Sequence, residues 1–133
     1  MTILYLTFYF EPDIGPGAFR NTALVNELSC QLTANDSIQV ITTQPNRYDS
    51  YKPAAVEQEE WYNGGCPISI HRIAVPTHKS GFIGQICSFF VYYRRAYRLA
   101  QAQKYNLVVA SSSRLFTAFW VPNWLENSLV CFF

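Results

Sequence analysis

The sequence predicts an α/β fold, namely a Rossmann-like parallel sheet of about five strands with helices on both faces. Strand-like runs alternate with helix-like segments along the 133 residues, as in strands joined by crossover helices. The strand candidates are apolar almost throughout, as they must be when both faces of a parallel sheet are buried. Half of the residues are hydrophobic and only 14% are charged, which is typical of a folded domain. We therefore expect a single domain over residues 1–133.

The first half of the chain is expected to supply two strands and one helix. Residues 3–10 are a short β-branched and aromatic run, and the prolines and glycines of "EPDIGPG" end it. A helix is expected over residues 18–32, and "TANDS" ends it before a second strand over residues 38–43. The apolar positions of this helix recur at helical spacing: Phe19, Ala23, Leu24 and Leu28.

The second half begins with a long polar connection over residues 44–67, which carries the turn signal "NGG". A connection of that length inside a compact domain is typical of a functional loop. The further elements expected are strands over residues 68–75, 107–110 and 129–133, a long helix over residues 82–104 and a shorter helix from Leu115.

Charge is distributed unevenly, and the helix over residues 82–104 carries much of the basic part. The first 60 residues have a formal net charge of −5, and the remainder has one of +6. An apolar stretch in this helix is followed by Arg94, Arg95 and Arg98. The stretch is too short to span a bilayer, which takes about 20 residues. Apolar residues next to arginines nevertheless suit an anionic membrane surface. In the alternative interpretation, its aromatic side chains face the sheet and its arginines are solvated. No nucleic-acid partner is expected, because no nucleic-acid-binding motif accompanies the bases.

Two glycines precede the first expected helix, in "GPGAFR" at residues 15–20. A dinucleotide fingerprint has a third glycine, and Arg20 stands at that position. It also has a shorter turn between the first strand and the glycines, and an acidic residue after the second strand. This sequence lacks both of these features as well. Amides at a helix N-terminus, with a guanidinium one turn in, suit an anion such as a diphosphate. The alternative is a loop that needs Gly15 and Gly17 only for their φ angles.

Three serines, Ser111, Ser112 and Ser113, follow the fourth expected strand, where ligands of open α/β sheets bind. Helix capping is their alternative role and the one favoured by the sequence. Neither a G-x-S-x-G motif nor a Walker motif is present.

The histidines and cysteines give no sign of a metal site. Neither His71 nor His78 has a carboxylate or a second histidine nearby in sequence, and the four cysteines form no C-x-x-C pair. The apolar N-terminus lacks the basic region of a signal peptide, so a cytoplasmic protein with reduced thiols is expected.

Four stretches carry a family likeness: "ILYLTFYFEPDIGPGAFRNTALVNELS", "IQVITTQPN", "ISIHRI" and "KYNLVVASSSRLFTAF". Together they resemble the N-terminal half of a family-4 (group 1) glycosyltransferase of the two-domain GT-B type, similar to bacterial enzymes that build O-antigen, capsule or other surface polysaccharide. The resemblance implies an acceptor-binding domain of an enzyme that transfers a sugar from a nucleotide-sugar to a lipid-linked or polysaccharide acceptor. It implies no cofactor, since the nucleotide-sugar is a donor substrate, and no metal is expected from the histidines and cysteines.

The resemblance also implies roles for individual residues and a place in the cell, the cytoplasm, with peripheral contact at the inner face of the cytoplasmic membrane. Contact with the donor diphosphate is implied for Gly15, Gly17 and Arg20, and lining of the cleft for Ser111, Ser112 and Ser113. Contact with the acceptor is implied for Arg47, Tyr48 and Tyr51. Contact with the membrane is implied for Arg94, Arg95 and Arg98.

Members of that family are much longer, and their Glu-containing donor site lies in a C-terminal domain without a counterpart in this sequence. The chain is therefore expected to be a fragment that lacks the nucleotide-sugar domain and has no appreciable transferase activity alone. Turnover of a donor and a lipid acceptor would contradict that expectation. The alternative is a non-catalytic α/β relic, or a module that binds a membrane or a partner chain.

Overall fold

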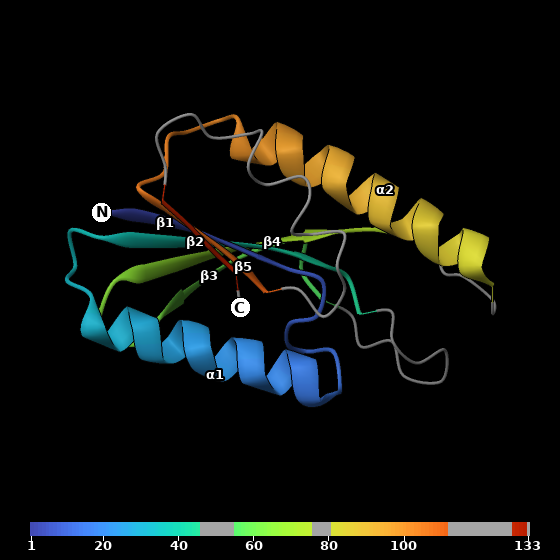
Figure 1. Cartoon of the computed structure of the whole chain (residues 1–133). Helices are drawn as coiled ribbons and strands as arrows, with labels where there is room; N and C mark the ends of the chain where they lie inside the picture. The colour runs from blue at the N-terminus through green and yellow to red at the C-terminus, as the bar shows by residue number, and fades with distance from the viewer. Residues whose placement is uncertain (46–54, 76–80, 112–128, 133) are drawn as a thin grey trace.

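The described part of the chain forms a sheet with a helix on each face. The computed structural model describes residues 1–45, 55–75, 81–111 and 129–132. The elements in chain order are β1 (Thr2–Thr7), α1 (Pro16–Gln31), β2 (Ser37–Thr43), β3 (Gln58–Tyr62), β4 (Pro67–Ile73), α2 (Phe82–Ala100), β5 (Leu107–Ser111) and β6 (Leu129–Phe132). The strands lie in the order β3-β4-β2-β1-β5-β6, and the two helices cover opposite faces (Figure 1). All these strand pairs are parallel except β3 with β4, so the predicted α/β fold is confirmed.

Strand β3 is not predicted by the sequence pattern, and it lies within the expected loop over residues 44–67. Its sequence, "QEEWY", has no apolar run because β3 is an edge strand whose side chains alternate between exposed and half-buried. Charged side chains on an edge strand discourage pairing with another chain. The turn predicted at "NGG" is confirmed, since these residues join β3 to β4. The helix expected from Leu115 lies outside the described residues.

Helix α1 begins at Pro16, whose fixed φ suits the first position of a helix. The predicted apolar face of this helix is partly wrong, because Phe19 is 54% exposed and Ala23 is also exposed. Leu24 and Leu28 do pack against the core. The buried positions are Ala18, Asn21, Thr22, Val25 and Ser29. The three polar members of this stripe are buried because each is hydrogen-bonded to a neighbouring segment.

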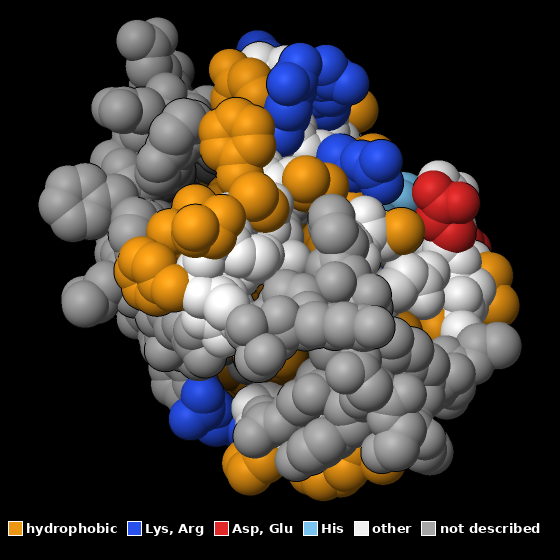
Figure 2. Space-filling model, turned by 90° about the vertical axis from the view of Figure 1, so that its right-hand side faces the viewer, with side chains coloured by type: hydrophobic (Ala, Val, Ile, Leu, Met, Phe, Trp, Pro, Cys, Tyr) orange, Lys and Arg blue, Asp and Glu red, His pale blue; other side chains and the backbone are white. Residues whose placement is uncertain are grey.

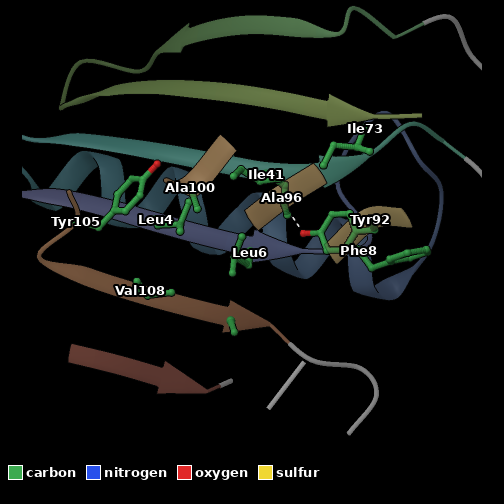
Figure 3. Close-up of a cluster of buried hydrophobic side chains, with 11 residues drawn as sticks. Leu4, Leu6, Phe8, Ile41, Ile73, Tyr92, Ala96, Ala100, Tyr105 and Val108 are labelled. Atoms are coloured by element: carbon green, nitrogen blue, oxygen red, sulfur yellow. Dashed lines mark hydrogen bonds between the residues drawn. The ribbon is translucent and has the colours of Figure 1, made fainter. Parts of the chain in front are cut away.

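Helix α2 packs its Tyr92, Ala96 and Ala100 side chains against the core on the other face of the sheet, among side chains from β1, β2, β4 and β5 (Figure 3). The buried Tyr92 hydroxyl donates to the carbonyl oxygens of Thr7, at 2.9 Å, and of Ile41, at 2.8 Å. This hydroxyl therefore ties α2 to the carboxyl ends of β1 and β2.

The aromatic residues of α2 divide between the core and the surface. Phe89 and Tyr93 pack against the core cluster, whereas Phe90 is 58% exposed and Tyr97 is 38% exposed. The interpretation in which the aromatic side chains of this helix face the sheet thus holds for only part of them.

The turn between β3 and β4 docks onto the C-terminal half of α1. The Ser29 hydroxyl donates to the Cys66 carbonyl at 2.8 Å, and the Cys66 amide donates to the Ser29 carbonyl at 3.1 Å. Gly65 lies against the same carbonyl, so closely that a Cβ atom on Gly65 would stand 1.8 Å from the Ser29 oxygen. A glycine at position 65 is thus required by packing.

Candidate functional site

The carboxyl ends of β1 and β5 lie side by side, with Thr7 paired to Ser111. From β1 the chain passes through α1 to β2, on one side of β1, whereas β5 is followed by β6 on the other side. Connections that leave neighbouring strands in opposite directions open a crevice beyond the sheet, and ligands of open α/β sheets bind there. The fold therefore places two segments at the topological position of a ligand site: the end of β5, and residues 8–17, which lead from β1 into the first turn of α1 and are called the glycine loop below.

A buried polar network centred on Asn21 forms the floor of this position. The Asn21 side-chain oxygen accepts hydrogen bonds from the Tyr5 hydroxyl at 3.0 Å and the Ser111 hydroxyl at 2.7 Å. Its amide nitrogen donates to the Thr7 hydroxyl at 2.7 Å and to the Tyr9 carbonyl at 3.0 Å. One α1 side chain thus joins β1, β5 and the glycine loop.

Electrostatics link Arg20 to this network. Burial raises the pKa of Tyr5, and both a hydrogen bond with Ser111 and the positive charge of Arg20 oppose that rise. The Arg20 side chain is exposed, so its charge faces solvent as well as the network. A negatively charged ligand at the start of α1 would therefore lie close to this cation.

The two glycines of the glycine loop differ in conformation and surroundings. Gly15 precedes α1 with φ 157° and ψ 160°, a region open almost only to glycine, and no side chain caps the helix N-terminus there. Gly17 is different, because an added Cβ would make only an ordinary contact at 3.9 Å with Tyr9. Packing thus leaves room for a side chain at Gly17, while conformation explains Gly15. The buried Asp13 accepts the Ile14 amide at 2.9 Å in the same loop.

Arg72 of β4 is hydrogen-bonded to the backbone of this loop. Its buried guanidinium donates to the Glu11 carbonyl at 3.0 Å, to the Val56 carbonyl at 3.0 Å and to the Glu59 carboxylate at 2.9 Å. The Thr43 hydroxyl adds a bond to the Phe8 carbonyl at 2.7 Å. Two strands therefore fix the backbone that leads to Gly15.

The structure brings together some of the predicted site residues and separates others. Gly15, Gly17 and Arg20 lie at the start of α1, and Ser111 joins them through Asn21. Tyr5 and Asn21 are not among the residues predicted from the sequence. Ala18, Asn21, Thr22 and Val25 share one face of α1 at helical spacing, and small or polar residues on that face are the signal that could have identified Asn21. The residues that lie outside the described part of the chain are Ser112, Ser113, Arg47, Tyr48 and Tyr51.

The three arginines predicted to face a membrane have different surroundings. All are exposed, but the Arg95 guanidinium turns toward the sheet and donates to the Ala74 carbonyl at 3.2 Å. Arg95 and Arg98 line a hollow beside β4, whereas Arg94 does not.

In the described segments, no group of three His, Cys, Asp or Glu side chains could hold a metal ion. Neither described helix is long and apolar enough to cross a membrane. No protein-family model matches the chain, and no curated protein matches it at significant similarity.

Proposed function

We propose that the chain acts as the acceptor-side α/β domain of a glycosyltransferase that moves a sugar from a nucleotide-sugar to a lipid-linked or polysaccharide acceptor. The observation that carries this proposal is the position of the Gly15–Gly17 loop, Arg20 and Ser111 at one switch point of the sheet. The sequence resemblance supplies the reaction class. A second α/β domain, wherever it is encoded, would complete the donor site.

The chemistry assigned to this chain is stabilisation of a leaving group. When the sugar departs from its nucleotide, negative charge develops on the nucleoside diphosphate, and donors already aimed at it lower the barrier. In this proposal, backbone amides at the start of α1 and the Arg20 guanidinium would be such donors. The Asn21 network and Arg72 keep the loop in place, so that these donors need little rearrangement.

Uridine diphosphate should bind the wild-type chain, and Arg20→Gln should weaken that binding about tenfold, because a charge-assisted hydrogen bond is lost. Gly17→Ala should fold normally, since the added methyl has space, but should also lower the affinity if the diphosphate approaches the helix backbone closely. Isothermal titration calorimetry measures both effects. Arg94→Gln is the matched control, because it removes the same charge from the other face of the sheet. Equal affinities for Arg20→Gln and Arg94→Gln would remove the support for the proposal.

A second candidate function, peripheral contact with an anionic membrane, is favoured by the outer face of α2. Phe82, Ile83 and Phe90 are 77%, 77% and 58% exposed, and α2 contains no acidic residue. Figure 2 shows hydrophobic side chains in a row beside a group of basic ones. Apolar side chains next to arginines are the pattern of a helix lying on a membrane surface.

Vesicles containing phosphatidylglycerol should therefore sediment with the chain at low salt, and vesicles of phosphatidylcholine alone should not. Phe90→Ser should reduce the binding about tenfold. The matched control is Phe19→Ser, because Phe19 is exposed to a similar extent, at 54%, but lies on α1 at the opposite face of the sheet. If both serine variants lose binding equally, the contact is not made by α2.

A further inference from the structure

A hollow of about 290 Å³ lies between the C-terminal half of α2 and the paired strands β3 and β4. It is two strands away from β1, so it is separate from the switch-point site. His71 lines it on the same face of β4 as Ile73, which packs in the cluster under α2. Arg95 and Arg98 line it from α2, and Glu57 lines it from the segment before β3.

The charges around this hollow are mainly positive. Arg95 and Arg98 are three positions apart and therefore neighbours on the helix surface. The bond from Arg95 to the Ala74 carbonyl holds the first guanidinium at the end of β4, and His71 lines the same hollow. The lining contains one acidic residue, Glu57, against His71 and three arginines; the third arginine, Arg72, is paired with the Glu59 carboxylate at 2.9 Å. Figure 2 shows basic, histidine and acidic side chains adjacent to one another on this face.

We infer that this hollow binds the phosphate group of a phosphorylated ligand, through Arg95, Arg98 and His71. Guanidinium forks match the geometry of phosphate oxygens, and two forks on adjacent helical positions can share one phosphate or a diphosphate. The volume is at the lower limit for small-molecule pockets, so it takes a phosphate or diphosphate group rather than a whole nucleotide-sugar. The inference goes beyond the proposed transferase function and does not depend on it, because Gly15, Arg20 and Ser111 have no part in this hollow.

The phosphate can come from a free anion or from a lipid headgroup at the membrane face of the same helix. Two-dimensional NMR of the histidine rings separates this hollow from the switch-point site, since His71→Gln identifies the His71 signal. Inorganic pyrophosphate should shift that signal saturably. Arg98→Gln and Arg95→Gln should each raise the dissociation constant about tenfold. Glu57→Gln should lower it about threefold, because a repelling charge is removed.

Arg94→Gln and Arg20→Gln are the matched controls and should leave the His71 titration unchanged. If pyrophosphate has no effect but vesicles containing phosphatidic acid shift the signal and phosphatidylglycerol vesicles do not, the phosphate comes from a lipid headgroup, and the inference holds. It is overturned if neither probe shifts the signal, if acetate at equal ionic strength shifts it equally, or if Arg94→Gln weakens binding as much as Arg98→Gln. Loss of the titration in Arg20→Gln would place the phosphate at the switch point instead.

Discussion

Replacing Gly65 with alanine is expected to lower the free energy of unfolding by about 3 kcal/mol, because the new methyl group would clash with the backbone of α1. Its Cβ would stand 1.8 Å from the Ser29 carbonyl oxygen and 2.6 Å from the carbonyl carbon, and both are backbone atoms of α1. A flexible side chain could turn away, but a helix backbone cannot. The turn must therefore lift from α1, and the two hydrogen bonds between Ser29 and Cys66 would be lost with it.

Gly64→Ala is the matched control, since it changes the neighbouring residue of the same turn. Gly64 has φ +85° and nothing within 4 Å of an added Cβ, so alanine there meets backbone strain of about 1 kcal/mol and no clash. Urea unfolding followed by circular dichroism measures both variants, with an unchanged m-value as the sign of an intact two-state transition. A Gly65→Ala variant as stable as Gly64→Ala would show that the turn does not pack on α1 as described.

Replacing Asn21 with alanine is expected to cost about 3 kcal/mol as well, for a different reason. Its side chain is the shared partner of three buried hydroxyl groups, on Tyr5, Thr7 and Ser111. Without Asn21, buried polar groups lose their partner at the same time, and each such loss costs about 1 to 3 kcal/mol. Part of this cost is recovered where hydroxyl groups find new partners.

Asn26→Ala is the control for this prediction, because Asn26 lies on the same helix and accepts one exposed hydrogen bond from Asn63 at 2.7 Å. Its loss should cost at most about 1 kcal/mol. A double-mutant cycle between Asn21→Ala and Ser111→Ala should give a coupling energy of about 1 kcal/mol, since the two residues are in direct contact. Independent effects of the two substitutions would contradict the network.

The fold could be predicted from the sequence because its core strands are simple apolar runs. "LVVA" and "IQVITT" can be buried on both faces only in a sheet covered by helices, and both lie in that sheet. β3 could not be predicted in this way, since an edge strand needs no apolar run and its pairing with β4 is set by the turn. The apolar pattern alone does not give the buried face of α1, because the polar residues Asn21 and Ser29 are buried through hydrogen bonds to other segments.

The candidate site could be predicted in position but not in composition. Parallel topology alone puts the loop after β1 beside the end of β5, so Gly15, Arg20 and Ser111 are brought to one place. The Asn21 network forms only because α1 is oriented with Asn21 toward the sheet, and tertiary contacts determine this orientation. The division of the arginines on α2, with Arg95 turned to the Ala74 carbonyl, depends on the same kind of contact. The glycosyltransferase function remains a prediction.

The bond from Arg72 to Glu11 joins residues that are 61 positions apart, and this has a consequence for the order of folding. Contacts between distant residues form only after the intervening chain has closed a large loop. Closing such a loop costs conformational entropy and therefore slows folding. On a ribosome, the glycine loop is synthesised early, but its support from β4 is not available until residue 72 has been made and paired. The loop before α1 therefore gains this support only when the middle of the sheet is assembled, although the loop itself is among the first segments to be translated.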